Sequence, residues 1–285
     1  MNSFHSKPNT FVNHVHLKVE NLIRSLEFYQ NLMGFQVLNQ SGKKAVLTAN
    51  GITPLLTIEQ PEDNIPKQMS TTGLYHYALL LPTRKDLGKL ITRLLNEQYP
   101  LQGASYHGTH DALYFQDPDG NGIEVAVDTE PSTWRDKTGE MDFSKNGPMD
   151  VESVIAAANG ERWNGIPEGT IIGHIHLHVS DLEKTKEFYH DGLGLDIVMD
   201  IPNQAVFFSS GGYHHHIGTN IWNGKNAPKP APNSVGMLFY TLVTPNEETR
   251  KSMVKKLEAL DYRVTEKKGE LFTEDPSGNR ILLYC

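Results

Sequence analysis

The chain has 285 residues, of which 38% are hydrophobic and 21% are charged, a composition typical of a globular protein long enough for two domains. Its formal net charge of -8 and the lack of a dense lysine and arginine stripe argue against a nucleic-acid partner. The only cysteine is Cys285, which excludes a disulfide framework and a thiolate metal cluster. No stretch approaches a membrane span and the first dozen residues hold no apolar signal segment, so we expect a cytoplasmic protein without a membrane partner.

An internal repeat organises the chain. The segment NHVHLKVENL at 13–22 returns as GHIHLHVSDL at 173–182, and each copy leads into Glu-Phe-Tyr. The ends repeat as well, because Asp-Pro-Asp-Gly-Asn at 117–121 is echoed by Asp-Pro-Ser-Gly-Asn at 275–279. We therefore divide the chain into two homologous domains, and the boundaries are 10–130 and 170–285, with a linker carrying one short helix over 131–169.

Each half is expected to contain a strand, a helix and three strands, twice over. The first strand, 14–19, alternates strictly, with Val15 and Leu17 on one face and His14 and His16 on the other. The elements predicted after it are a helix that closes at Gly34, strands over 45–49 and 54–58, a strand over 74–82, a helix over 84–97, a strand pair over 111–127 and a linker helix over 151–158.

The strand pair over 111–127 contains the most informative single residue. Its Asp-Pro-Asp-Gly-Asn-Gly turn supplies a fixed φ at the proline and permissive glycines after it. Glu124 is a lone carboxylate in an otherwise apolar strand, where burial without a partner would cost several kcal/mol or shift its pKa. It is either an exposed residue of a half-buried strand or a group with a metal or proton-transfer role.

These elements predict an α+β fold of paired βαβββ modules. Each module has an apolar face that its helix covers and a polar face left over. Two modules side by side would curl their polar faces into a cup. We therefore expect two tandem cup-shaped domains of mixed sheet, one cup from the two modules of each half.

Three residues of the first half are candidates to face its cup. His14 and His76 lie on the first strands of its two modules, and Glu124 lies on the last strand of the second. Two imidazoles and one carboxylate form a facial triad that leaves positions open on Fe(II) and also suits Mn(II). These ligands leave a divalent metal with one net positive charge, which a catechol monoanion would neutralise. The alternative for each histidine is an ordinary core or surface position, since the chain has 13.

The motifs together resemble those of the vicinal oxygen chelate superfamily. They are His-Val-x-Leu-x-Val before a helix ending in Phe-Tyr, Tyr-His-Tyr-Ala at 75–78, and Asp-Pro-Asp-Gly-Asn-Gly-Ile-Glu at 117–124. This group includes glyoxalase I, fosfomycin-resistance transferases, bleomycin-binding proteins and type I extradiol dioxygenases. The resemblance covers nearly the whole chain, and the His-His-His run at 214–216 most resembles bacterial catechol-2,3-dioxygenases of the CatE type.

The resemblance implies a dioxygenase that cleaves a small aromatic diol with dioxygen, with iron held by His14, His76 and Glu124. It also implies that His107 and Tyr114 hydrogen-bond the substrate or an oxygen-derived anion. The alternatives for these two are a loop histidine and an ordinary strand aromatic.

One feature of the first half departs from the extradiol pattern. Extradiol enzymes carry an acid-base histidine on the last strand of the first module, where this half has Thr53 and Pro54. Proton transfer would then need His16, His107 or a water molecule.

The second half keeps the histidines of its first module but not the rest of the triad. His174 is retained, and His215 aligns best with the acid-base histidine. Phe239 stands where His76 does and Leu282 where Glu124 does, so no triad forms within this half. We expect it to serve structure or to shape an entrance, and a second metal or anion site at His174 and His215 is the alternative.

Two other classes of function fit the sequence. One is a metal-dependent lyase of the glyoxalase kind or a thiol transferase, in which the metal polarises an oxyanion without oxygen chemistry. The other is a ligand-sequestering protein without catalysis, which would have no need of three convergent ligands. Exposed module edges favour a homo-oligomer.

Overall fold

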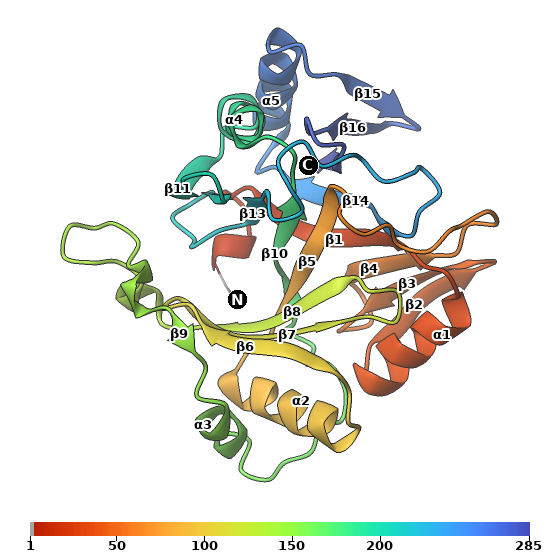
Figure 1. The fold of residues 1–285 in the computed structure, drawn as a ribbon, viewed down its shortest axis with the longest axis vertical. Coiled ribbons are helices and arrows are strands. Elements are labelled where there is room, and N and C mark those ends of the chain that lie inside the picture. Colours follow the sequence, from red (N-terminus) through yellow and green to blue (C-terminus); the bar gives the residue numbers. More distant parts are fainter. Residues whose placement is uncertain (1–2) are drawn as a thin grey trace.

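The computed structural model describes residues 3–285, which form two mixed β-sheets with the helices at the periphery (Figure 1). Each half contains two modules, which we number one to four in chain order. Module one consists of β1 Phe11–Lys18, α1 Leu22–Leu26 with a π-helical turn at Glu27–Leu32, β2 Gln36–Ser41, β3 Lys44–Thr48 and β4 Pro54–Glu59. Module two consists of β5 Gly73–Leu80, α2 Arg84–Asn96, β6 Leu101–Tyr106, β7 His110–Gln116 and β8 Gly122–Asp128.

The second half repeats this order after a linker. The linker contains short 3-10 turns at Pro131–Thr133 and Phe143–Lys145, β9 Gly147–Pro148 and α3 Val151–Ala156. Module three consists of β10 Ile171–His178, α4 Leu182–Lys186 with a π-helical turn at Glu187–Gly192, β11 Asp196–Ile201, β12 Ala205–Ser209 and β13 Ile217–Asn220. Module four consists of β14 Gly236–Val243, α5 Glu247–Ala259, β15 Val264–Lys267, β16 Glu270–Glu274 and β17 Arg280–Tyr284. The remaining short helix is a 3-10 turn at Ser3–His5.

Helix α2 shows how the local sequence sets an element. Thr83 caps it, because its side chain accepts a hydrogen bond from the backbone N–H of Asp86. Its buried face is apolar, and Gly88 on that helix approaches α3 so closely that a Cβ would lie 2.2 Å from the carbonyl oxygen of Val154. The predicted helices over 84–97 and 151–158 are thus confirmed, and they pack together where only glycine fits.

The two sheets combine modules from different halves. Within residues 3–285, the first sheet has eight strands in the order β15-β16-β17-β14-β1-β4-β3-β2, which are modules four and one. The second has nine strands in the order β11-β12-β13-β10-β5-β8-β7-β6-β9, which are modules three and two. Strand β1 pairs with β14 and β5 pairs with β10, both antiparallel.

The α+β class and the paired modules in two mixed sheets are therefore confirmed, but the partners differ from the expectation of one cup for each half. Each cup takes one module from each half. The alternation of apolar and polar residues sets which face of β1 is buried, but it does not set which other first strand lies beside it.

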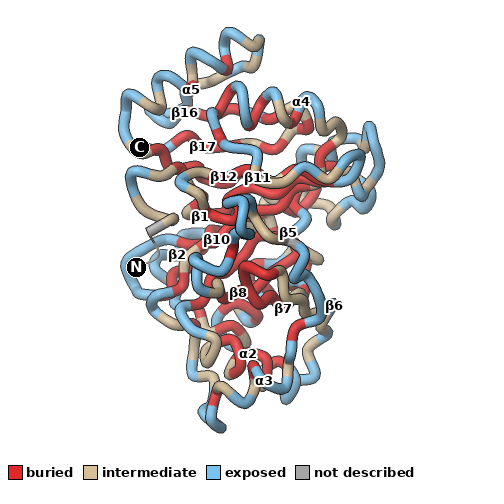
Figure 2. The backbone as a smooth tube through the Cα atoms, turned by 90° about the vertical axis from the view of Figure 1, so that its left-hand side faces the viewer, coloured by how far each residue is buried: buried red, intermediate tan, exposed pale blue. Residues whose placement is uncertain are grey.

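The apolar core lies between the sheets and their helices. Val15 and Leu17 on β1 and Ile175 and Leu177 on β10 are all 0% exposed, as their alternation predicts. Figure 2 shows the buried residues concentrated along the central strands β1, β10 and β8. Among the described residues, no helix combines the length and apolar character needed to cross a membrane.

The repeated Phe-Tyr and Asp-Pro motifs bind the two modules of each half to one another. The Tyr29 hydroxyl of module one donates to Asp117 of module two at 2.9 Å, and Tyr189 of module three donates to Asp275 of module four at 3.0 Å. The other oxygen of Asp117 accepts the backbone N–H groups of the turn at 2.8 and 2.9 Å. These motifs therefore shape the turns and connect the sheets, because each hydroxyl reaches across from one sheet to the other.

Candidate metal centre

The candidate site lies on β8, β5 and β10, which run side by side in the second sheet. The strand register places Glu124 beside Ala78, and Ala78 beside His174, so the three residues form one row across the sheet. His76 precedes Ala78 by two residues and so points to the same face. Because alanine has only a methyl group, the longer side chains on both sides of it can meet above it.

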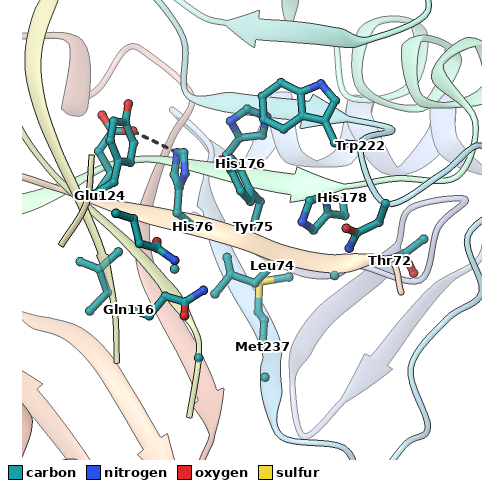
Figure 3. Close-up of a pocket in the computed structure, with 18 of the residues that line it drawn as sticks. Thr72, Leu74, Tyr75, His76, Gln116, Glu124, His176, His178, Trp222 and Met237 are labelled. Carbon is teal, nitrogen blue, oxygen red and sulfur yellow. Dashed lines mark ion pairs between the residues drawn. The ribbon is translucent and has the colours of Figure 1, made fainter. Parts of the chain in front are cut away.

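Three side chains converge at this point. His76 Nε2 lies 3.0 Å and His174 Nε2 lies 3.3 Å from the same oxygen of Glu124, Oε2. One ligand atom from each of the three residues lies within 4.8 Å of the others, and all three residues are buried. Figure 3 shows His76 directed at Glu124 from β5, at one end of a cavity.

The donor set fits a divalent cation. His76 Nε2 and Glu124 Oε1 are buried, and neither has a hydrogen-bond partner among the described residues despite the close approach of the two side chains. Unpaired buried polar atoms are costly and rare in native proteins. Two imidazole nitrogens and a carboxylate at one point are the ligands of a facial triad, and a bound Fe(II) or Mn(II) would satisfy both atoms.

The protonation states suit metal ligands. Burial alone would raise the pKa of Glu124, but the neighbouring imidazoles of His174, His110 and His76 hold it well below the usual range. Burial lowers the pKa of His174. A deprotonated carboxylate and neutral imidazoles are the forms that bind a cation.

His14 does not belong to this group. It lies on β1 in the first sheet, where its Nε2 lies 2.8 Å from the Thr57 hydroxyl. The row equivalent to the site is there His14, Thr241 and Leu282, since β1 pairs with β14 and β14 with β17. The expected set of His14, His76 and Glu124 is therefore not assembled, because His174, the repeat partner of His14, lies beside module two instead.

His107 and Tyr114 lie together beside the three convergent residues. The ring nitrogen Nε2 of His107 is 2.8 Å from the Tyr114 hydroxyl, and the Tyr114 ring centroid is 5.6 Å from that of His76. Burial lowers the pKa of His107 to about 4 and raises the pKa of Tyr114. Both side chains line the cavity, in the neutral forms that donate and accept single hydrogen bonds.

His215 also reaches this cavity, although it belongs to the second half. Its ring centroid lies 4.1 Å from that of His174, and its side chain lines the cavity wall. Thr53 and Pro54, which replace the acid-base histidine in the first half, lie beside or on β4 in the other sheet. The pairing of modules therefore brings His215, the residue that the sequence aligned with that histidine, from module three into the cavity beside His76 and Glu124. His174 and His215 are the alternative second site that the sequence indicates. In the structure both residues lie at the same site as His76 and Glu124.

Sequence reasoning missed His110. It lies on β7, with Nε2 at 3.2 Å from Glu124 Oε1. A signal was present, because His110, Ala112 and Tyr114 alternate along one strand and so share the face that carries Tyr114.

The cavity extends from the three convergent residues along an aromatic wall. Its volume is about 910 Å³. The ring of His176 lies 5.0 Å from His76, and the ring of Tyr75 lies 5.1 Å from His176 and 5.2 Å from Trp222. Figure 3 shows this wall from His76 to Trp222, with Met237 on the other side. Sequence reasoning also missed these aromatic residues.

Comparison with known proteins identifies the class. The family model of the Glyoxalase/Bleomycin resistance protein/Dioxygenase superfamily matches residues 11–125 and 171–283, and the chain belongs to this superfamily. A crystal structure of glyoxalase I from Zea mays has the same fold, with a TM-score of 0.58 at 16% identity over 96% of this chain and 92% of that one.

Two curated relatives show the range of activities within the superfamily. The chain is 43% identical to catechol-2,3-dioxygenase of Bacillus subtilis (strain 168) over 287 residues, which cover 100% of this chain and 99% of that protein. It is 25% identical to the metallothiol transferase FosB of Lysinibacillus sphaericus (strain C3-41) over 120 residues, which cover 41% of this chain and 82% of that protein.

Proposed function

We propose that the protein is an extradiol dioxygenase that cleaves a catechol-type ring with iron held by His76, Glu124 and His174. The observation that carries this proposal is the convergence of these three buried side chains at one end of a large cavity. The full-length similarity to catechol-2,3-dioxygenase of Bacillus subtilis supports the same reaction class.

The ligand set determines the charge of the site. Two neutral imidazoles and one carboxylate would leave a divalent metal with one net positive charge, which matches a diol that has lost one proton. Bound there, Fe(II) would supply a Lewis acid for the two vicinal oxygens and the redox capacity that dioxygen chemistry requires. Mn(II) is compatible with the same ligands.

The surrounding residues have distinct proposed roles. His215 would hold the proton of a substrate hydroxyl, since it is the cavity histidine next to His174. His107 Nε2 and the Tyr114 hydroxyl lie 2.8 Å apart, so with His107 donating to Tyr114 the tyrosine hydroxyl would donate a hydrogen bond to an oxygen that gains negative charge. Because these three groups are largely buried, water would compete little for such hydrogen bonds.

The cavity favours a diol that carries a further apolar or aromatic group. Its volume of about 910 Å³ lies in the upper part of the range of roughly 300–1,000 Å³ for sites of drug-sized ligands. The wall formed by Tyr75, His176 and Trp222 offers ring faces to such a group, and the Trp222 side chain is 52% exposed at the outer end. We therefore propose substituted catechols as the substrate class.

The direct test is anaerobic reconstitution with Fe(II), followed by a catechol and air. We would measure metal per chain, oxygen uptake and the yellow ring-opened semialdehyde, with catechol and 3-phenylcatechol as substrates. One iron per chain with product and matching oxygen uptake supports the proposal, and a higher kcat/KM for 3-phenylcatechol supports the substrate class.

The similarity to a metallothiol transferase favours one alternative, a lyase or transferase that uses the same ligands without oxygen. Bound metal with no oxygen uptake across several catechols would overturn the dioxygenase proposal in favour of that alternative. No bound metal would overturn both and leave a ligand-binding protein.

A further inference from the structure

Behind the cavity, His215 is the first of three residues in a hydrogen-bonded row. His215 Nδ1 lies 2.8 Å from Nδ1 of His214, and His214 Nε2 lies 3.1 Å from Oδ1 of Asp128. The row begins at the cavity and ends at the carboxylate, which closes β8. His214 is 1% exposed, so water does not compete for either of its ring nitrogens.

The chemistry of these groups sets the direction of both hydrogen bonds. A carboxylate only accepts, so the proton between His214 and Asp128 must be on His214 Nε2. A neutral imidazole has one proton, so His214 Nδ1 is then an acceptor. The 2.8 Å contact between the two Nδ1 atoms requires one donor, which must therefore be His215.

The surroundings of His214 keep it neutral and in place. Burial, with His110 and His174 nearby, lowers its pKa well below 6.5. Its ring stacks on His110 at 4.6 Å with planes 16° apart, and it lies 3.9 Å from the Tyr213 ring and 5.2 Å from the Trp134 ring. The Tyr213 hydroxyl also donates to Asp128 Oδ1 at 3.2 Å, which holds the carboxylate oxygen that His214 uses.

We propose that Asp128 and His214 are positioning residues that hold His215 in one tautomer, with its proton on Nδ1. Nε2 of His215 then presents a lone pair, and that nitrogen is the one left for the cavity. The arrangement is a property of the folded chain, whereas its use in proton transfer rests on the proposed dioxygenase function. Two of the three consecutive histidines at 214–216 thus have a role, since His215 faces the cavity and His214 anchors it.

The first part of the test reads the tautomer directly. Full-length protein labelled with ¹⁵N-histidine is studied by NMR in two forms, one metal-free and one loaded with diamagnetic Zn(II). A His215→Gln variant assigns the His215 resonances. We expect a protonated Nδ1 and an unprotonated Nε2 on His215. In Asp128→Asn the amide can donate or accept, so this preference should be lost, whereas Asp111→Asn, which alters a carboxylate bonded to Arg84, should keep it.

The second part measures turnover in the Fe(II) enzyme. Asp128→Asn should lower kcat about 100-fold, the low end of what a general acid-base group contributes, with KM within a factor of two. Should Asp128→Asn fail to fold, His214→Phe also removes the acceptor for His215 Nδ1 and should give the same two changes. The inference would be overturned if wild-type His215 had its proton on Nε2. It would also be overturned if folded variants kept the wild-type tautomer or the wild-type kcat. The predicted tautomer in a protein without ring-cleavage activity would overturn the proposed function and leave the positioning intact.

Discussion

Two histidines at the same position of the internal repeat should differ in their effect on metal binding. His14 on β1 and His174 on β10 have closely similar flanking sequences, but only His174 lies beside His76 and Glu124. We expect His174→Ala to weaken Fe(II) and Mn(II) binding at least about 100-fold. We expect His14→Ala to leave the affinity unchanged within a factor of two.

The magnitude follows from the role of each residue. Loss of a group that only supports a metal ligand typically costs about 10- to 100-fold in affinity, so loss of a ligand itself should cost more. A factor of 100 corresponds to about 2.7 kcal/mol. His110 could in principle replace His174, since its Nε2 lies 3.2 Å from Glu124. Its stacking on His214 and the 2.8 Å contact of its Nδ1 with the Thr109 hydroxyl oppose that movement.

The assay is titration calorimetry with Mn(II), which avoids oxidation, together with metal analysis after anaerobic Fe(II) loading. Thermal unfolding of the metal-free variants serves as the control for folding. If His14→Ala lost the metal and His174→Ala kept it, the site would lie within the first half, and the pairing of modules two and three would not define it.

The remaining predictions concern stability and substrate binding. Gly122→Ala should lower the free energy of unfolding by about 1–3 kcal/mol, because its Cβ would lie 2.0 Å from a carbonyl oxygen of β5. In the control Gly103→Ala the added Cβ would have no atom within 4 Å, so the free energy of unfolding measured in urea should hardly change. Burial lowers the pKa of His14 to about 4, so the unfolded chain binds more protons below pH 6.5, and about 3 kcal/mol of stability should be lost between pH 6.5 and 4. His14→Gln should flatten this dependence of stability on pH, and exposed His190→Gln should not. If the curves of stability against pH for the wild type and His14→Gln were parallel, His14 would not be the group responsible. Trp222→Ala should raise KM for 3-phenylcatechol more than for catechol with kcat unchanged, and equal effects on both would remove Trp222 from the substrate wall.

Local patterns in the sequence predicted most of the fold. The alternation in β1 predicted its buried face, and the helix predicted over 84–97 agrees with α2 within one residue at its end. The repeats predicted four modules, and the two half-chain matches to one superfamily agree with them. These features depend on residues close in sequence, which is why a pattern can reveal them.

The sequence predicted correctly only those residues of the candidate site that come from the same module. Module two contains both His76 and Glu124, and these do meet. The third member depends on whether β1 or β10 lies beside β5, and both strands carry the same alternating histidines. One signal favoured β10: module one has Thr53 and Pro54 at the position that His215 occupies in module three, so only modules two and three together provide two imidazoles, the carboxylate and His215.

The two kinds of contact between modules link the chain into a closed ring. Hydrogen-bonded strands join module four to module one and module two to module three, while the tyrosine-aspartate bonds join one to two and three to four. Every module is thus held by two neighbours through different interactions. A half-length ancestor with the same contacts would have left the edges of β1 and β5 open, and two such chains could close the ring only as an intertwined dimer. Duplication in one chain would then have freed each copy to change alone, so that the row of His14, Thr241 and Leu282 could come to differ from the row of His174, Ala78 and Glu124.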